Sequence, residues 1–435
     1  MKKIYLFLLL CFGFGLSAQV INFPDANFKA KLLQASPSNT TASTETPNIY
    51  GDVQSYNTID TNGDGEIQVS EASLIKYLKV PFTGNSSSVS SLIGIANFTN
   101  LQVLICNSNN NLTALDVSGL SDLKWLECKS NQLSNLNVNG LTNLVSLNYS
   151  FNPLPNVNIS SLTGLKELLC RQNNIASLNL SGLINIELID CRDNQLSNIN
   201  VSFLNNLKYF HCSNNLLTSL NVVGMSNLTY IAFANNQIPS IDLTGVNLTA
   251  LDCSYTPISF SNFTPGSLLN LRNLMCSGLQ LTNLDFSLFP LLTNLNCSFN
   301  QLSHLDVSSL TSLNSLSCNN NSLNEIIMKN GNPNWYTLNF QANPNITYIC
   351  ANEQNLTFVQ NKIDSYGYTN CHVNSYCNFI PGGISYTIQG NVKFDLTNNG
   401  CDSADLNVPN PKFAITNGAV SGMLIANETG NYSIP

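Results

Sequence analysis

Hydrophobic residues recur with a fixed period through more than half of this chain. Residues 123–144 show the pattern in full, as Leu-x-x-Leu-x-Cys-x-x-Asn-x-Leu, then Leu-x-Val, then Leu-x-x-Leu again. The pattern returns about every 21 residues between residues 92 and 349. Its Leu-x-Cys part alternates inward apolar and outward positions, which predicts a short β-strand. Repetition at this period is typical of a solenoid, in which each coil stacks on the one before it.

One inward position fixes the phase of the repeat and predicts about twelve coils. Its occupants are Cys106, Cys128, Tyr149, Cys170, Cys191, Cys212, Phe233, Cys253, Cys276, Cys297, Cys318 and Phe340. An asparagine follows three residues later in most coils, and we expect its side chain to bond backbone groups where the chain turns. These asparagines are Asn131, Asn152, Asn173, Asn194, Asn215, Asn236, Asn300, Asn321 and Asn343. Thr256 and Leu279 interrupt the series and predict a distorted middle.

The first residues of the chain predict export. Lys2 and Lys3 form a positive start, an apolar run follows, and Leu16-Ser17-Ala18 is a small-residue cleavage site. This order is typical of a secretory signal peptide over residues 1–18, and its apolar run is too short to span a membrane. An uncleaved anchor is the alternative. We expect no membrane span and a mature chain that is secreted or held at the cell surface.

Residues 19–91 are predicted to form a small N-terminal cap. Asp25 stands as an N-cap before Phe28 and Leu32, which favours a short helix there. Residues 35–58 are rich in Ser, Thr, Asn and Pro and predict a loop.

Residues 60–71, DTNGDGEIQVSE, match the twelve-residue EF-hand loop. Oxygen-bearing side chains stand at loop positions 1, 3, 5, 9 and 12, a glycine stands at the sharp turn, and position 7 offers a backbone carbonyl. The predicted metal ligands are Asp60, Asn62, Asp64, Glu66, Gln68 and Glu71. We therefore predict calcium as a structural cofactor, with Ile67 in the core and a helix over residues 71–78. A bare Asn- and Asp-rich turn is the alternative.

The repeats resemble the leucine-rich-repeat family, in the short 21-residue class of exported bacterial proteins. The resemblance covers about residues 92–349. A calcium loop directly before such repeats is similar to secreted proteins of the flavobacterial kind and to the capped repeat domains of internalins. The resemblance implies a β-rich solenoid with a parallel β-sheet and short coils, preceded by a small α-helical calcium-loop cap.

The cysteines of the repeats are predicted to be core residues. The chain has 14 cysteines, which in an exported protein first suggests a disulfide framework. Tyr149, Phe233 and Phe340 replace cysteine at the same inward position, however, and free cysteine is among the most buried residue types. We expect buried free thiols in the repeats, and a metal or redox role is the weaker alternative.

Residues 350–383 are predicted to form a C-terminal cap and linker. Residues 353–368 place apolar side chains on one helical face, which would cover the last coil. The pairs expected to staple this cap are Cys350–Cys371 first and Cys377–Cys401 second. A zinc site using His372 is the alternative on spacing alone.

Residues 384–435 differ in texture from the repeats. Residues 384–394 alternate apolar and polar positions, which predicts a strand, and an oxygen-rich turn follows at 395–405. No carboxylate stands at the twelfth place of that turn, so calcium there is left open. The segment looks like the start of the Ig-like β-sandwich domains of bacterial adhesins. Because the chain stops at Pro435, before such a sandwich would close, we expect further C-terminal domains in a longer protein.

Composition excludes several classes of function. The formal charge is −8 and only 10% of the residues are charged, so nothing basic is present to neutralise nucleic-acid phosphates. The 3 histidines lie outside any nucleophile or zinc-protease motif. We therefore expect neither a nucleic-acid partner nor an enzyme.

The outward positions of the strands offer a candidate ligand-binding patch. Aromatic and charged side chains gather there in a weakly charged protein, and Trp, Tyr and Arg are the usual anchors of interfaces. The candidate residues are Trp125, Glu127, Lys129, Glu167, Arg171, Asp190, Arg192, Tyr209, His211, Tyr230 and Tyr255. We expect an extracellular protein or glycan as ligand, in adhesion or recognition at the cell surface. The alternatives are solvated strand residues without a ligand, and a spacer that presents other domains.

Overall fold

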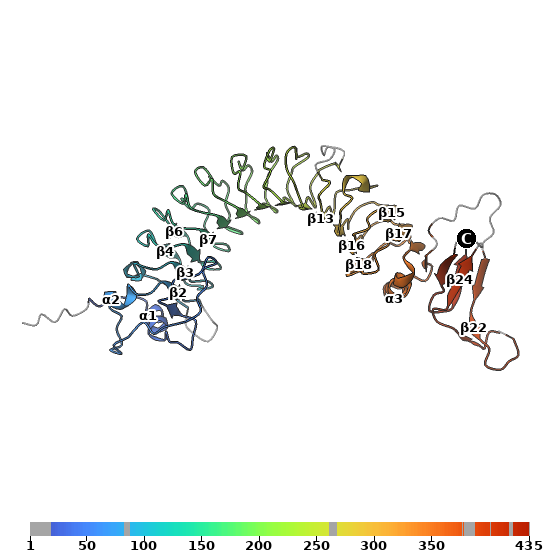
Figure 1. Ribbon diagram of the computed structural model, residues 1–435, viewed down its shortest axis with the longest axis horizontal. Coiled ribbons are helices and arrows are strands. Elements are labelled where there is room, and N and C mark those ends of the chain that lie inside the picture. Colours follow the sequence, from blue (N-terminus) through green and yellow to red (C-terminus); the bar gives the residue numbers. More distant parts are fainter. Residues whose placement is uncertain are drawn as a thin grey trace, which may run out of the picture. The chain divides into compact units, whose positions relative to one another are not determined.

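The computed structural model describes residues 19–81, 88–260, 268–375, 377, 388–400, 402–416 and 421–434. The predicted signal peptide, Cys401 and residues 384–387 of the predicted strand lie outside these residues. The chain divides into two compact units, Met1–Ile199 and Asn200–Pro435. Figure 1 labels some of their helices and strands.

The first unit begins with the cap helix that the sequence predicts, α1 (Ala26–Leu33). Asp25 caps it, because its Oδ1 accepts hydrogen bonds from two backbone N–H groups of the first turn. Its Oδ2 accepts three more, from Ser90 N, Ser90 Oγ and Ser91 N, at 2.6 to 3.0 Å. One carboxylate therefore caps the helix and ties it to the start of the repeats.

The helix predicted over residues 71–78 is wrong. α2 (Val69–Ala72) is a single turn, and the chain then extends into β2 (Tyr77–Lys79). β2 pairs antiparallel with β1 (Ala42–Ser43) and parallel with β3 (Val103–Ile105). The pairing buries Leu78 completely, and this tertiary contact outweighs a weak local preference for helix. The main sheet thus begins inside the segment predicted as the cap.

The rest of the first unit stacks coils in register. Beyond β3, its main sheet contains β5 (Trp125–Glu127), β7 (Ser146–Asn148), β8 (Glu167–Leu169) and β9 (Leu188–Asp190), all parallel. Between main strands, the short helix η1 (Ile95–Asn97) is followed one coil later by β4 (Ala114–Asp116) and then by β6 (Asn135–Asn137). β4 and β6 pair with each other in a separate parallel sheet of two strands.

The second unit repeats the arrangement. Its main strands are β10 (Tyr209–His211), β11 (Tyr230–Ala232), β12 (Ala250–Asp252), β13 (Asn273–Met275), β14 (Asn294–Asn296), β16 (Ser315–Ser317) and β18 (Thr337–Asn339). The short helix η3 (Phe286–Leu288) precedes β14. The second sheet of this unit contains the parallel strands β15 (His304–Asp306), β17 (Glu325–Ile327), β19 (Tyr348–Cys350) and β20 (His372–Asn374).

The predicted parallel β-solenoid of leucine-rich-repeat type is confirmed. The described residues contain 13 main-sheet strands of three residues, which are the twelve predicted coils and the additional strand β2. The ladder cysteines are free and buried, also as predicted. Burial raises the pKa of the Cys170 thiol to about 12, and that of Cys297 likewise to about 12. Such thiols are core packing residues, because the reactive thiolate form is disfavoured.

The asparagine ladder satisfies backbone groups inside the solenoid, as predicted. Asn131 Nδ2 donates to the carbonyls of Cys128 at 2.7 Å and Cys106 at 3.1 Å. Its Oδ1 accepts from the N–H of Asn109, a buried asparagine that extends the ladder by one coil. At the predicted break, Thr256 Oγ1 donates to the Cys253 carbonyl at 2.6 Å and replaces the missing amide in part.

The last coil of the second unit is covered by η4 (Glu353–Asn355) and α3 (Leu356–Tyr366), which confirms the predicted capping helix. The favoured disulfide is wrong: Cys350 pairs with Cys377, at a Cα–Cα distance of 5.4 Å, and Cys371 is a buried free thiol. The second predicted pair is therefore also wrong. The reason is β20, whose Asn374 lies opposite Cys350 and carries the chain on to Cys377. The disulfide also removes two ligands from the alternative zinc site.

The C-terminal segment forms short antiparallel ladders. β21 (Ile388–Asn391) pairs with β26 (Asn431–Ile434), and β22 (Lys393–Phe394) pairs with β23 (Leu406–Asn407). β24 (Lys412–Thr416) pairs with β25 (Ser421–Ile425), which continues the second sheet through β20. Part of the predicted strand 384–394 is thus present, and the adhesin-like sandwich stays a prediction. No described helix is long and apolar enough to cross a membrane.

Candidate ligand-binding surface and calcium loop

On the first unit, both arginines of the predicted patch form ion pairs with aspartates. Arg192 forms a two-pronged contact with Asp190, with Nε–Oδ1 at 2.8 Å and Nη2–Oδ2 at 2.6 Å. Arg171 contacts Asp193 Oδ2 at 2.5 Å, and its guanidinium lies 5.3 Å from the centre of the Phe151 ring. These pairs neutralise the charge of this part of the strand face, while Glu167 stays exposed.

Trp125 is placed differently from its prediction as an open anchor. Its ring is partly buried against the cap, beside the cluster of Val53, Tyr77 and Val103. Gly51 has φ +84°, and a side chain there would meet the Trp125 ring at 3.2 Å. The cap therefore leaves less of Trp125 for a ligand than the sequence suggests. Two other predicted residues lie nearby: Glu127 accepts a bond of 2.8 Å from Asn107 Nδ2, and Lys129 is exposed.

On the second unit, three predicted residues come together. Parallel register sets Tyr209 of β10 directly beside Tyr230 of β11. The rings of His211 and Tyr230 lie 4.5 Å apart, centre to centre, and Tyr209 is 46% exposed. We call Tyr209, His211 and Tyr230 the β10–β11 cluster.

Tyr255 does not lie on a strand. β12 ends at Asp252, and Tyr255 adopts a left-handed conformation with φ 55° in the following turn. Its ring rests on Gly278 of the next coil and lies 6.4 Å from the ring of Phe299, whose φ is 56°. Alternation alone places both aromatics on the strand face, but the turn after each strand rotates them away from it. They form a second aromatic group, which we call the turn pair.

Sequence reasoning missed a shallow hollow further along the same sheet, of about 210 Å³. Its walls are apolar and uncharged polar side chains: Asn273, Leu274, Met275, Asn294, Leu295, Asn296, Ser315, Ser317 and Thr337. The outward Asn and Ser residues can be identified from the sequence. The candidate patch does not include them, because that patch is chosen by aromatic and charged side chains. Met275 is the one exposed large apolar side chain among them.

The predicted calcium loop turns sharply at two glycines. Gly63 and Gly65 have φ values of 73° and 77°, and Gly65 N donates to Asp60 Oδ2 at 3.0 Å. Ile67 is fully buried, as predicted, and its carbonyl accepts from the N–H of Ile21. α2 begins within the loop, at Val69, but residues 58 and 59 before the loop are not helical, so the motif is half of an EF-hand.

The ligand side chains of the loop converge. Gln68 Nε2 and Asn62 Nδ2 both donate to Asp64 Oδ2, at 2.8 and 3.1 Å. Glu71 closes the loop, because its two carboxylate oxygens accept from Thr61 N at 2.7 Å and from Gln68 N at 3.0 Å. The side chain of Glu66, whose backbone carbonyl is the predicted ligand, forms an ion pair with Lys29 at 2.6 Å.

This donor set fits a hard cation such as calcium. The amides of Asn62 and Gln68 need only turn about their last bond to present oxygen in place of nitrogen. Among the described residues, no three His, Cys, Asp or Glu side chains gather into a metal cluster. A cation in this loop would therefore depend on amide and carbonyl oxygens as much as on carboxylates.

The second oxygen-rich turn shares one element with the calcium loop. Asp395 Oδ2 accepts from Gly400 N at 2.8 Å, as Asp60 does from Gly65. This bond, with those from neighbouring N–H groups, holds the pKa of Asp395 below its usual value. Cys401 interrupts the described part of the turn.

Solved structures with the same fold come from bacterial leucine-rich-repeat proteins. One of them is the functional domain of InlJ from Listeria monocytogenes, which is reported to include a cysteine ladder. The match covers 94% of this chain and 92% of that domain, with 22% identity and a TM-score of 0.53. Another is an internalin, InlF, from Listeria monocytogenes strain 4b F2365. That match covers 78% of this chain and 93% of InlF, with 21% identity and a TM-score of 0.55. No protein-family model and no curated protein matches the sequence. The chain is therefore a leucine-rich-repeat solenoid with an internalin-like fold.

Proposed function

We propose that this chain is a non-catalytic recognition protein, secreted or held at the cell surface, that binds an extracellular protein through its strand face. The β10–β11 cluster carries the proposal. Its two tyrosines and one histidine are set side by side by the register of two strands, so they need little ordering when a ligand binds.

Tyrosine anchors interfaces because it combines a large apolar face with a hydroxyl that bonds at the rim. The neighbouring hollow at Met275 and the uncharged amides around it extend the apolar and hydrogen-bonding area of the same unit. The proposal does not need catalysis, since neither the cluster nor the hollow presents an activated nucleophile. A glycan ligand or a role as a spacer are the outcomes that compete with it.

An array of purified extracellular protein domains and a printed glycan array test this proposal with the full chain as probe. A captured protein ligand should bind Tyr209→Ser/Tyr230→Ser at least about 30-fold more weakly, since even a single anchor residue contributes about 2 kcal/mol or more. Tyr336→Ser is the matched control, because Tyr336 lies in the same unit, outside the cluster, and is 79% exposed. Capture by glycans alone, or capture indifferent to both tyrosines, would sink the proposal.

We also propose that calcium occupies the loop of residues 60–71 and stabilises the cap. Supporting this are the two glycines at the turns, the clamp of Glu71 and the convergence of Asn62, Asp64 and Gln68. The ion would join Gln68 and Glu71, which open α2, to the preceding turn, and so hold the segment that leads into β2. Its role would be structural, because a single half EF-hand offers no second helix pair to open.

A further inference from the structure

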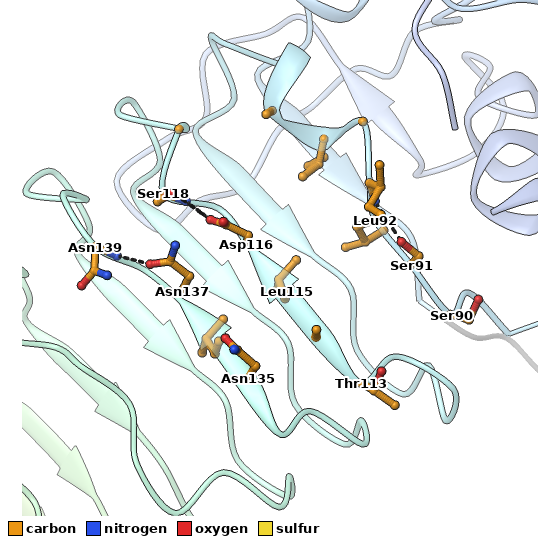
Figure 2. Close-up of a pocket in the computed structure, with 17 residues that line it drawn as sticks. Ser90, Ser91, Leu92, Thr113, Leu115, Asp116, Ser118, Asn135, Asn137 and Asn139 are labelled. Carbon is orange, nitrogen blue, oxygen red and sulfur yellow. Dashed lines mark hydrogen bonds between the residues drawn. The ribbon is translucent and has the colours of Figure 1, made fainter. Parts of the chain in front are cut away.

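A groove of about 990 Å³ lies in the first unit, away from the strand face. Figure 2 shows its two walls: Ser90, Ser91 and Leu92 on one side, and β4 with Leu115 and Asp116 on the other. The first wall is fixed, because Ser90 and Ser91 donate three hydrogen bonds to Asp25. The groove is therefore a built feature of the junction between cap and repeats.

The second wall is the edge of a strand. Toward β6, Val117 N donates to Asn137 O at 3.0 Å, and Thr113 O accepts from Ser134 N at 2.9 Å. Alternate residues of a parallel strand bond to opposite sides. Ala114 and Asp116 therefore direct their backbone N–H and C=O groups into the groove. Within the described residues, no backbone hydrogen bond joins them to the segment of residues 90–96.

The preceding coil of the chain supplies no strand to pair with this edge of β4. Where a strand preceding β4 would lie, the chain forms η1, after Gly94 with φ +104°. A side chain at Gly94 would meet the Phe23 ring at 2.7 Å, so the cap packs directly against this bend. Straightening the segment would break that packing. Among the described residues, the edge of β4 that faces the groove therefore pairs with no strand, whereas β3 pairs with a strand on each side.

The groove has a defined length. At one end, Asn111 N bonds to Ser88 Oγ at 3.4 Å, and at the other a side chain at Gly119 would meet Ala96 Cβ at 3.9 Å. Residues 112–118 lie between these closures. At about 3.3 Å per residue, an extended chain of about six residues spans that stretch.

The charge of the groove is negative. Asp116 is the one charged residue among the described residues that line it. Its carboxylate accepts from Ser118 N at 3.0 Å and from Ser118 Oγ at 2.7 Å. These bonds hold the pKa of Asp116 below its usual value, so the groove carries a carboxylate at neutral pH. Ile93, which is 63% exposed, adds an apolar contact on the opposite wall.

We propose that this groove binds an extended peptide with a lysine or arginine side chain, which adds a strand to the outer edge of β4. The peptide backbone bonds the N–H and C=O groups of Ala114 and Asp116, and its basic side chain pairs with the Asp116 carboxylate. A glycan would leave the alternating backbone groups of the edge without matched partners. A second copy of the chain would have to bring its own β4 past the wall at Ser90–Leu92. The site is separate from the β10–β11 cluster and does not depend on it.

A random seven-residue peptide library displayed on phage, panned against the full chain and counter-selected on Ala114→Pro, tests the proposal. Proline at this position removes one groove-facing N–H and leaves the bonds to β6 intact. Selected peptides should contain Lys or Arg, and they should bind at least about tenfold more weakly to Ala114→Pro, and about fivefold more weakly to Asp116→Asn, in fluorescence anisotropy. N-methylation of alternate peptide residues should abolish binding for one set of positions and spare the other.

β15 supplies matched controls, because it is an edge strand with the same local sequence. Asp306 accepts from Ser308 N at 2.9 Å, as Asp116 does from Ser118 N, and Val307 N donates to Ile327 O at 2.8 Å. His304→Pro and Asp306→Asn should leave peptide binding unchanged. Equal losses at β4 and β15 would overturn the assignment to the groove.

Three other outcomes would overturn the proposal. They are no enriched peptide, N-methylation effects without alternation, and a dimer in analytical ultracentrifugation that Ala114→Pro dissociates. Asp116→Lys keeps the test decisive if Ala114→Pro fails to fold, because it reverses the charge without touching the backbone. Peptides that bind Asp116→Lys as well as the natural chain would contradict the charge pairing. Tyr209→Ser/Tyr230→Ser should leave peptide binding intact, which separates this site from the proposed ligand surface.

Discussion

The strand faces of the two units are built on the same coil, yet they present different chemistry. On the first unit, Arg171 and Arg192 are paired with aspartates, and Trp125 is partly covered by the cap. On the second, Tyr209 and Met275 are exposed among amides and hydroxyls. The difference teaches that inward Leu, Cys and Asn residues carry the fold, which leaves the outward positions of each coil free to vary.

The two units also differ in how their ends are held. The first begins with α1, the oxygen-rich loop and a groove at the junction with the repeats. The second is covered by α3 and stapled by the Cys350–Cys377 disulfide. The first unit contains the predicted calcium loop, so we expect its stability to depend on calcium. The cap of the second unit is held by a disulfide, so we expect its stability to be independent of calcium.

The largest effect is expected where the second unit packs an aromatic ring on backbone. Gly278→Ala forces a left-handed conformation that costs about 1–2 kcal/mol in a residue with a side chain. The new Cβ also meets the Tyr255 ring, and overpacking of this kind costs about 1–3 kcal/mol more. Calorimetric unfolding of the full chain measures the loss.

Gly140→Ala is the control for Gly278→Ala, because Gly140 has φ +80° and no atom within 4 Å of the added Cβ. It should show the conformational cost alone. Gly278→Ala/Tyr255→Ala should recover most of the excess. Equal losses for the two single variants would contradict the turn pair as described.

The turn pair also shows why part of the site escapes prediction from sequence. Strict alternation predicts the burial of Leu126 and Cys128 correctly, because hydrophobic burial repeats with the strand. It fails at Tyr255, since one left-handed residue after each strand breaks the alternation. Such a residue is glycine in only one of these coils, at Gly278, so no general sequence signal marks it.

The ends of the molecule escape prediction for a different reason. Asp25 caps its helix by a local rule that the sequence displays, and the prediction holds. The strands β2 and β20 form only because a neighbouring strand offers them a partner, and no local pattern encodes that partner. Both errors, the helix over residues 71–78 and the pairing of Cys350 with Cys371, follow from such long-range strand pairing.

Removal of calcium is expected to affect the first unit and spare the second. An ion held at about 100 times its dissociation constant stabilises by about 2.7 kcal/mol. Chelator should lower the melting temperature of the full chain, and hydrogen exchange should rise in β2 and β3 but not in β16 and β18. Asp60→Ala and Glu71→Ala should abolish the chelator effect.

Asp122→Ala is the matched control for the calcium loop, because Asp122 is an exposed carboxylate of the same unit outside the loop. It should retain the full response to chelator. If chelator changes neither melting nor exchange in the natural chain, calcium has no structural role here.

The smallest effect is expected from the paired charges of the first unit. Arg171→Ala/Arg192→Ala removes two ion pairs whose arginine side chains are 38% and 35% exposed, and pairs of this kind contribute about 0–1 kcal/mol each. The Arg192 pair should lie at the upper end of this range, because Asp190 is buried. Stability should therefore change little, and ligand binding should change less than about threefold, in the same calorimetric and binding measurements. The physical reason is that aspartates already neutralise these guanidinium groups, so a ligand would have to displace a bonded partner to use them. A loss of binding larger than that of Tyr209→Ser/Tyr230→Ser would reverse the comparison between the units and place the ligand on the charged face of the first.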